Sequence, residues 1–388
     1  MTNSMNLPWV ESPFSKQVLK SKNKVVNQIS SLKITLLTLI CFILNSPISF
    51  SQTKNSDWTL VNFIKLDAKN PILNPTLTQV FDCPIQGKKV AWENKNVLNP
   101  TALIKDGKVH LIYRAQDSLG TSRIGLAISQ DGIHFKKEAL PILYPQNDAY
   151  QKYEWPGGIE DPRVVVTEEG KYLLTYTSYD GKTARLCSAI SSDLRNWTKL
   201  GPMLKDPKYI DLWSKSGAIV VKESQQQMIA TKIQGKYWMY YGDTNLFLAE
   251  SDDLIDWKVC EDEENKTAIS VLHPRKGHFD SRLVEPGPFA LLRPQGILLI
   301  YNSSNSANYN EKRFPKFTYS AGEALFDKNM PYKLLDRTLK PFIWPNKIYE
   351  QIGEVNEVCF VEGLVHFKNK WFLYYGTADS KIAVAVKN

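Results

Sequence analysis

The sequence predicts an all-β fold, and within that class a five-bladed β-propeller, because one strand pattern recurs along most of the chain. Five segments share one plan: an apolar strand, a turn with Gly or Asp, a Tyr-rich strand, a third strand and an Asp-containing turn. No segment keeps a helical period, whereas alternation and β-branched residues recur. The 10 Trp, 18 Tyr and 16 Phe among 388 residues also favour strands.

The first three repeats carry the clearest turn signals. In the first, Lys105-Asp106-Gly107-Lys108 is typical of a β-hairpin turn. These repeats close in Asp-x-x-x-Phe or Asp-x-x-x-Trp, beginning at Asp131, Asp193 and Asp253, and this recurrence indicates structural turns rather than catalytic groups. The five repeats include residues 102–135, 163–197, 235–257, 287–335 and 363–386.

The N-terminal segment is predicted to be a signal peptide and leader over residues 1–51. Lysines between residues 16 and 33 form a basic region, an apolar stretch follows from Ile34 to Leu44, and Ser49-Phe50-Ser51 fits a small-x-small cleavage site. The apolar stretch is too short for a comfortable transmembrane helix. We therefore expect export to the periplasm or the exterior after cleavage near Ser51, with residues 52–388 forming a single catalytic propeller.

Charge and cysteine content exclude several functional classes. Residues 1–51 hold five of the 48 Lys and Arg and one of the 40 acids, so the rest of the chain has 43 basic and 39 acidic residues. Such a mild excess gives no basic stripe of the kind that binds nucleic acid. The four cysteines beyond the leader show no metal-like spacing, and Cys187 and Cys359 fall in apolar strands as expected buried thiols. We predict no metal and no organic cofactor.

The run from Gly157 to Val165 concentrates the most chemistry in the shortest stretch. Glu160, Asp161 and Arg163 surround a proline, directly before a β-branched strand. Glycines permit unusual backbone conformations and Pro162 fixes φ, so a rigid turn at the strand entrance would present Asp161 and Arg163 at the sheet edge. The alternative is an ordinary loop with a surface Asp–Arg pair. In a propeller the innermost strands converge on a central funnel, where charged interruptions indicate a site.

At Gly158-Ile159-Glu160-Asp161-Pro162-Arg163 the chain resembles glycoside hydrolase family 130, the β-mannoside phosphorylases and β-mannosidases. The similarity extends over most of the chain beyond the leader, and the family fold is a five-bladed propeller, in agreement with the repeats. The further matching fragments are Asn99-Pro100, Tyr113-Arg114-Ala115, residues 124–127 and 129–132, Phe279-Asp280-Ser281, Gly287-Pro288, Tyr349-Glu350 and residues 375–379.

The resemblance implies a role for each matching residue. Asp161 matches the family's general acid, which is thought to protonate the glycosidic oxygen through a hydroxyl of the bound mannose. An adjacent Arg would lower the pKa of that carboxyl, so desolvation or a relay has to compensate. The residues expected to bind or orient the substrate are Asn99, Arg114, Glu160, Arg163, Lys215, Asp280 and Asp379.

The departures from the family pattern favour water as the attacking group. Phosphorylases carry a His-Arg pair at the end of the Tyr-rich strand of the third blade, where phosphate binds. Here these positions hold Tyr241 and Gly242, and Asp243 follows. The loss of such donors removes charge-assisted hydrogen bonds of roughly 1.5–3 kcal/mol each, so phosphate is expected to bind poorly.

Two glutamates are candidates for the base of an inverting hydrolase, which activates water at about 6.5–9.5 Å from the acid. Glu285 lies where many phosphorylases have a small residue, and Glu357 lies where they usually have Asn. A structural hydrogen-bonding role is the alternative for each glutamate.

The sequence therefore predicts an exported inverting glycosidase that releases mannose from β-mannosides, with an oligosaccharide or glycan as its partner. Three alternatives stay open. One is a β-mannoside phosphorylase that produces mannose 1-phosphate, and another is a noncatalytic glycan-binding propeller. The third is a related propeller glycosidase that acts on arabinosides or other furanosides. Linkage, aglycone and oligomeric state are not fixed by the sequence.

Overall fold

The computed structural model describes residues 57–388, so the predicted leader and its cleavage site lie outside the described residues. Almost every regular element in this range is a β-strand, and the helices α2 (Gln151–Glu154) and α3 (Ile348–Gln351) are single turns. The all-β class predicted from the sequence is therefore confirmed. No helix within residues 57–388 is long and apolar enough to cross a membrane.

Two N-terminal groups of antiparallel strands contain the first two repeats. Their strands are β4 (Asn96–Lys105), β5 (Lys108–Gln116), β6 (Ser122–Ser129) and β7 (Lys136–Lys137), then β8 (Gly158–Val166), β9 (Tyr172–Tyr179), β10 (Ala184–Ser191) and β11 (Thr198–Pro202). Each strand pairs with the next within its group. In the β4–β5 hairpin Lys105 lies opposite Lys108 while Asp106 and Gly107 have positive φ, which confirms the predicted turn.

The next two groups are less regular. Their strands are β12 (Ala218–Ser224), β13 (Gln227–Ala230), β14 (Tyr237–Tyr241), β15 (Leu246–Ser251), β16 (Trp257–Val259) and β17 (Ser270–Leu272), then β18 (Leu283–Pro286), β19 (Ala290–Arg293), β20 (Gly296–Ser304), β21 (Tyr319–Phe326) and β22 (Leu334–Arg337). β12 pairs with both β13 and β14, and β15 pairs with β16 and β17. In the following group both β18 and β19 pair with β20, so its first strand is split in two.

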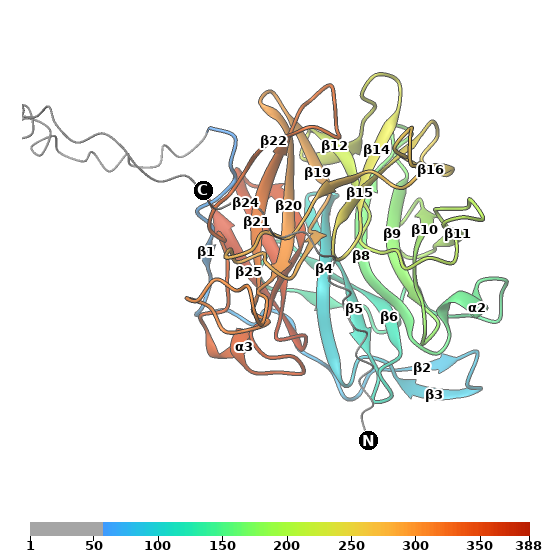
Figure 1. The fold of residues 1–388 in the computed structure, drawn as a ribbon. Coiled ribbons are helices and arrows are strands. Elements are labelled where there is room, and N and C mark those ends of the chain that lie inside the picture. Colours follow the sequence, from blue (N-terminus) through green and yellow to red (C-terminus); the bar gives the residue numbers. More distant parts are fainter. Residues whose placement is uncertain (1–56) are drawn as a thin grey trace, which may run out of the picture. The chain divides into compact units, whose positions relative to one another are not determined.

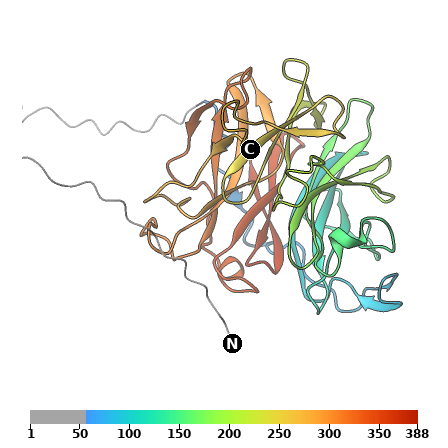
Figure 2. The same ribbon diagram turned by 45° about the vertical axis from the view of Figure 1, so that its right-hand side comes forward.

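The last group joins the two ends of the described chain. It contains β23 (Cys359–Phe367), β24 (Lys370–Thr377), β25 (Lys381–Lys387) and β1 (Ile64–Lys65), and a separate hairpin is formed by β2 (Val80–Cys83) and β3 (Lys88–Ala91). β1 pairs antiparallel with β25, and the two lie side by side in Figure 1. Figures 1 and 2 both place the cyan and green strands β4–β11 on one side and the orange and red strands β20–β25 on the other.

One tyrosine in each group marks the shared plan of the repeats. It lies on the second long strand of its group, is almost fully buried, and donates its hydroxyl proton to an acceptor outside that strand. The pairs are Tyr113 with Glu93, Tyr176 with Glu154, Tyr240 with the Pro331 carbonyl, Tyr301 with Asp280, and Tyr374 with the Gly132 carbonyl. Burying a tyrosine without a partner for its hydroxyl would be costly, so these acceptors are part of the fold.

The Asp-containing turns are structural, as their recurrence indicated. In each, a serine hydroxyl and an aspartate carboxylate two residues later accept backbone N–H groups of the turn. The pairs are Ser129 with Asp131, Ser191 with Asp193, and Ser251 with Asp253. The buried thiols expected at Cys187 and Cys359 are also found, and both are free.

The first strands of the groups pack beside one another. β4 packs against both β23 and β8, and the Val164 N–H of β8 donates to the Thr101 hydroxyl of β4. β12 pairs parallel with β19, and Asn302 of β20 exchanges two hydrogen bonds with the Val361 backbone of β23. Polar residues on these first strands are therefore brought close together.

Bulges in the first strands carry the polar motifs. In β4 the ladder skips Asn99, in β8 it skips Asp161 and Pro162, and in β23 it skips Glu362. Asn99 and Asp161 have φ of 46° and 47°. The rigid turn predicted at the entrance of the strand after Gly157 was wrong in this detail, because Asp161 lies inside β8, where a bulge rather than a loop re-aims its side chain.

Candidate active site

A cavity of about 180 Å³ gathers most of the residues predicted to form the site. Four lining residues lie on strands: Asn99 on β4, Arg114 on β5, Asp161 on β8 and Glu285 on β18. The other two polar residues lie outside strands, Lys215 before β12 and Asp379 between β24 and β25. The rest of the lining is mostly apolar and consists of Tyr319, Val355, Val358 and Phe360. The sequence patterns did not identify these four residues, because an apolar or aromatic residue looks the same in a sequence whether it lines a core or a cavity.

Asp161 is held on three sides by donors. Its Oδ1 accepts hydrogen bonds from the Asn99 amide (2.8 Å) and from Arg114 Nη1 (3.1 Å), and its Oδ2 lies 3.4 Å from Lys215 Nζ. Burial by itself would raise the pKa of Asp161, but Arg114, Lys215 and the Asn99 amide together lower it well below its usual range. Asp161 is therefore a carboxylate in the free protein at neutral pH.

Arg114 joins Asp161 to its sequence neighbour Glu160. Its Nη2 lies 2.6 Å from Glu160 Oε1, and its Nε donates to the Ser122 hydroxyl at 2.9 Å. Burial raises the pKa of Glu160, against the opposing effect of Arg114, and the nearby charge of Asp161 adds to the rise. One guanidinium thus fixes the orientation of two adjacent carboxyl groups.

Lys215 stands between Asp161 and Glu285. Its Nζ lies 3.4 Å from Asp161 Oδ2 and 3.3 Å from Glu285 Oε1, so these two oxygens are at most about 6.7 Å apart. This upper bound falls at the lower edge of the about 6.5–9.5 Å separation used by inverting enzymes. The Ser216 hydroxyl also donates to Glu285 Oε1, and burial raises the pKa of Glu285 while Lys215 opposes that rise.

Asp379 completes the ring of carboxyl groups around the cavity. It follows Ala378 in the turn between β24 and β25, and both residues have positive φ, 49° and 46°. Burial raises its pKa to about 6, with Arg114 lowering it and Asp161 raising it further. Asp379 therefore changes its charge close to neutral pH, unlike Asp161.

Arg163 lies behind the cavity rather than in its lining. Its guanidinium donates to the carbonyl oxygens of Gly287 (2.6 Å) and Pro286 (2.8 Å), and to its near neighbour Asp161 (3.2 Å). The same group lies 2.8 Å from the fully buried Glu362, whose pKa is raised far above its usual value by burial. Arg163 thus ties the backbone at Asp161 to the backbone directly after Glu285.

Like Glu160 and Arg163, the predicted site residues Asp280 and Glu357 lie outside the cavity lining. Asp280 is fully buried, and its Oδ2 accepts hydrogen bonds from Arg275 Nη2 (2.7 Å) and Tyr301 (2.9 Å) and lies 2.6 Å from Arg337 Nη2. It is the acceptor for the tyrosine of its group, as Glu93 and Glu154 are for theirs. The structure therefore places Asp280 in the support of the fold, outside the lining of the Asp161 cavity.

Glu357 lies on the segment between two residues of the cavity lining. It is partly exposed in the segment before β23 with φ of 61°, and its backbone carbonyl accepts a hydrogen bond from the Tyr319 N–H at 2.8 Å. Burial and the charge of Glu350 raise its pKa. Its neighbours Val355 and Val358 line the cavity whereas Glu357 does not.

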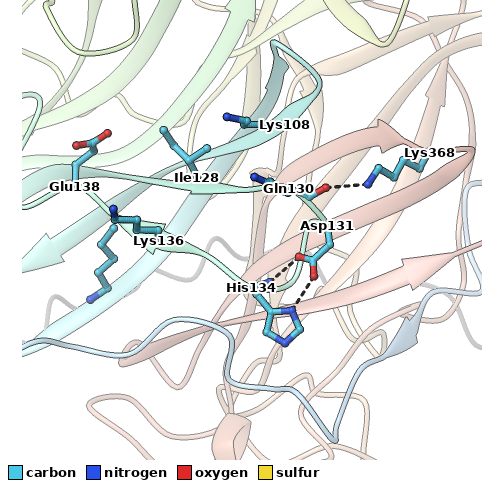
Figure 3. A pocket seen from close by; sticks show the side chains of 9 residues that line it. Lys108, Ile128, Gln130, Asp131, His134, Lys136, Glu138 and Lys368 are labelled. Carbon is cyan, nitrogen blue, oxygen red and sulfur yellow. Dashed lines mark hydrogen bonds and ion pairs between the residues drawn. The ribbon is translucent and has the colours of Figure 1, made fainter.

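A larger hollow, of about 730 Å³, has a different character (Figure 3). In it Asp131 bonds to His134, and Lys368 donates to the Gln130 carbonyl at 2.9 Å. None of the predicted site residues lines this hollow, so size does not identify the active site. Within residues 57–388 no cluster of His, Cys, Asp or Glu has the arrangement of a metal site.

Solved structures of similar chains share this fold. A putative glycosidase from Bacteroides thetaiotaomicron VPI-5482 is 44% identical, with a TM-score of 0.83 over 85% of this chain and 97% of that one. Another, 43% identical, has a TM-score of 0.84 over 86% of this chain and 95% of its own. It is described with the finding that family 130 of mannoside phosphorylases contains glycoside hydrolases that target β-1,2-mannosidic linkages in Candida mannan.

Curated relatives are phosphorylases. A 1,2-β-oligomannan phosphorylase of Thermoanaerobacter sp. (strain X514) is 29% identical over 324 residues, 80% of this chain and 96% of the relative. A β-1,2-mannobiose phosphorylase of the same organism is 30% identical over 328 residues, with the same shares. The family model described as beta-1,4-mannooligosaccharide phosphorylase matches residues 64–388. The chain therefore belongs to glycoside hydrolase family 130.

Proposed function

We propose that the chain is a β-mannoside-cleaving enzyme whose site is the Asp161 cavity. The observation that carries this proposal is the convergence of six polar side chains on one small cavity, supplied by groups of strands far apart in the sequence. These residues are Asn99, Arg114, Asp161, Lys215, Glu285 and Asp379. We also propose that the antiparallel groups are the five blades of a propeller, with β4, β8, β12, β18 and β23 as the strands nearest its axis.

Asp161 is the proposed acid. In the free protein Arg114 and Lys215 keep its pKa low, so it has to gain a proton when substrate binds. A bound mannose unit would exclude water from Asp161, and its hydroxyls would compete for the two cations. Both effects raise the pKa of a carboxyl group. The protonated Asp161 would then pass its proton through a mannose hydroxyl to the leaving glycosidic oxygen.

Water is the acceptor that the side chains around the cavity favour. Arg114 and Lys215 are the cations that line it within the described residues, and each is already paired with two carboxyl groups. A phosphate dianion would have to displace one of these partners and approach the other carboxylates. In the hydrolytic reaction, a water oxygen bonds to the anomeric carbon as the glycosidic bond breaks, and the base takes the water proton.

Glu285 is the proposed base, because it lines the cavity and shares Lys215 with Asp161. Glu357 is the alternative, since its neighbours Val355 and Val358 line the same cavity. Glu285→Gln and Glu357→Gln separate them: loss of a general base lowers kcat by about 10²–10⁴-fold. Full activity in both variants would refute a glutamate base at either position.

Phosphorolysis is the second candidate, and the named activities of the curated relatives support it better than hydrolysis. Product analysis over β-1,2- and β-1,4-linked mannobiose, with and without inorganic phosphate, separates the two reactions. Free mannose formed at an unchanged rate without phosphate supports hydrolysis. Mannose 1-phosphate as the product, with no cleavage when phosphate is left out, overturns hydrolysis.

A noncatalytic glycan-binding protein would have the same cavity without turnover. Asp161→Asn tests this reading, because the amide keeps the size of the side chain but cannot donate the proton of an acid. Loss of turnover with retained binding of mannobiose, measured by calorimetry, supports catalysis. Binding without any turnover in the unmodified protein contradicts it.

We further propose that the protein is exported after cleavage near Ser51, on the pattern of its first 51 residues. Expression in a bacterial host with a periplasm, followed by mass analysis of the N-terminus in each fraction, tests this. A full-length chain confined to the cytoplasm would contradict it.

A further inference from the structure

The hollow of about 730 Å³ in Figure 3 lies away from the proposed active site. Lys108, which lines the hollow, is the first residue of β5, and Arg114, which lines the Asp161 cavity, follows six residues later on the same strand. A strand rises about 3.3 Å per residue, so these two positions are about 20 Å apart. The hollow can therefore hold a ligand of its own.

The lining of this hollow is polar and mostly basic. One apolar side chain, Ile128, lines it, and its lining contains no Trp, Tyr or Phe. The basic residues of the lining are Lys108, His134, Lys136, Lys137 and Lys368, and the acidic residues are Asp131 and Glu138.

Both acidic residues of the hollow are already held by other groups. Asp131 Oδ1 accepts the backbone N–H groups of Ile133 (2.9 Å) and His134 (2.8 Å), and its Oδ2 bonds to the His134 ring at 2.7 Å. Glu138 Oε1 lies 2.6 Å from Arg195 Nη2. Neither carboxylate is therefore available to neutralise the lysines around it.

Three ammonium groups of the hollow are left without a counter-charge. Lys137 is paired with a carboxylate at 2.9 Å, but Lys108, Lys136 and Lys368 form no ion pair with any carboxylate of residues 57–388. All three are exposed, and Lys368 is held in place because its Nζ donates to the Gln130 carbonyl at 2.9 Å (Figure 3). Each can make a charge-assisted hydrogen bond to an anion.

The repeats show whether the fold itself requires these cations. Each of the first three repeats has the same Asp-containing turn, and four positions around that turn can be compared. They are Lys108, Gln130, His134 and Lys136 in the first repeat, Lys171, Ser192, Asn196 and Thr198 in the second, and Lys236, Asp252, Asp256 and Lys258 in the third. The four residues of the second repeat also line a hollow, of about 280 Å³.

Of these three repeats, the first gathers the most unpaired positive charge around its turn. In the third repeat Asp252 Oδ2 lies 2.7 Å from Lys236 Nζ and neutralises it. Gln130 stands at the equivalent position of the first repeat, so Lys108 has no such partner. The second repeat has a single lysine at the four positions. Because the same turn forms without the extra cations, a ligand explains them better than the fold does.

The lining favours an anionic polysaccharide over other polyanions. Surfaces that bind membranes use apolar or aromatic anchors, and single-stranded nucleic acid stacks on aromatic side chains. The lining of this hollow offers neither. It offers separate ammonium groups and the neutral amide of Gln130, which suit a chain that carries hydroxyl groups between its negative charges.

We propose that this hollow binds an anionic polysaccharide through its carboxylate, sulfate or phosphate groups. The site is separate from the Asp161 cavity, so it goes beyond the proposed cleavage of β-mannosides and does not depend on which group attacks the sugar. It would hold the protein on an acidic glycan while the Asp161 cavity stays open to its substrate.

Affinity electrophoresis tests the proposal, with polygalacturonate or dextran sulfate in the gel and neutral dextran as the comparison. Lys108→Glu combined with Lys136→Glu should weaken binding to both polyanions about tenfold or more, because two attractive contacts become repulsive. Lys171→Glu combined with Lys258→Glu is the matched control, since it changes the charge equally at equivalent positions of the other two repeats. All four lysines are exposed, so both double variants should keep the Tm of the unmodified protein.

The outcomes separate this inference from the proposed function. Binding that weakens as salt is added, and that is lost in the first double variant alone, supports the proposal. No binding of either polyanion by the unmodified protein, or an equal loss in both double variants, overturns it. Equally tight binding of single-stranded DNA, phosphatidylserine vesicles or inorganic phosphate overturns the polysaccharide as the ligand. Turnover of β-mannobiose should be the same in both double variants as in the unmodified protein, so either proposal can fail while the other stands.

Discussion

Removal of the Lys215 ammonium should move the pH profile of the enzyme to higher pH. The ammonium lies 3.4 Å from Asp161 and 3.3 Å from Glu285, and it is nearly buried. At an effective dielectric constant of about 20, each such pair interacts by about 5 kcal/mol, which corresponds to a ceiling of about 3.7 pKa units. Net values for hydrogen bonds to charged groups are about 1.5–3 kcal/mol, or about one to two pKa units.

The direction of the shift follows from the state that each group needs. Lys215 lowers the pKa of Glu285 and of Asp161, so both rise in Lys215→Met. A base works when ionised, and its pKa sets the low-pH side of the kcat profile, which reports the enzyme–substrate complex, where Asp161 is proposed to hold its proton. That side should therefore move up by about one to two pH units. The high-pH side, set by the acid, should move in the same direction.

The assay is kcat at saturating β-mannobiose between pH 4 and pH 9, with Lys136→Met in the hollow of Figure 3 as the control. Lys136 is exposed and lines no part of the Asp161 cavity, so its profile should not move. An active Lys215→Met variant with an unmoved low-pH side would refute Glu285 as the base. It would favour Glu357, whose pKa is set by burial and Glu350 instead.

Three further perturbations have directions fixed by the structure. Gly158→Ala should lower the free energy of unfolding by about 3 kcal/mol in urea titration, because φ is 104° and the new methyl overlaps the Ser122 carbonyl, whereas Gly170→Ala, in open space, should cost less. Burial raises the pKa of Glu323 to about 7. The protonated side chain therefore contributes stability that is fully present below about pH 4.5 and is lost as the pH rises through 7. The Tm of Glu323→Gln, compared with that of the unmodified protein, should increase over that range. Arg163→Lys should lower kcat by about 100-fold with little change in KM and with an unchanged Tm. If the Tm of this variant falls together with kcat, the loss comes from destabilisation and the positioning role is contradicted.

The fold class and the turns could be predicted because they depend on local pattern. The Lys105–Lys108 turn and the Asp131, Asp193 and Asp253 turns are formed by short-range hydrogen bonds, which the residue types at fixed offsets specify. The repeat also anticipated one long Tyr-bearing strand for each group. These features need no knowledge of which segments meet in space.

The contacts of the site could not be predicted in the same way. Asp280 lies in a fragment that matches the family, but its partner Arg337 comes 57 residues later, and only the folded chain shows that the pair is buried. The bulge at Asp161 was missed because nothing in a linear pattern distinguishes a strand with an extra residue from a turn followed by a strand. Lys215 looked like one substrate ligand, whereas it bridges two carboxyl groups from different groups of strands.

The pairing of β1 with β25 has a consequence for how the chain folds. Ile64 lies opposite Val386, and the nearby Leu60 N–H donates to Glu323, so the first described segment finds its partners only after more than 250 residues have followed. Contacts of such sequence separation slow folding, because a long loop must close before they form. The last sheet therefore cannot be completed until the residues of β25 are available to pair with β1. A chain that lacks β25 would expose the edges of both β24 and β1, which are ready templates for aggregation.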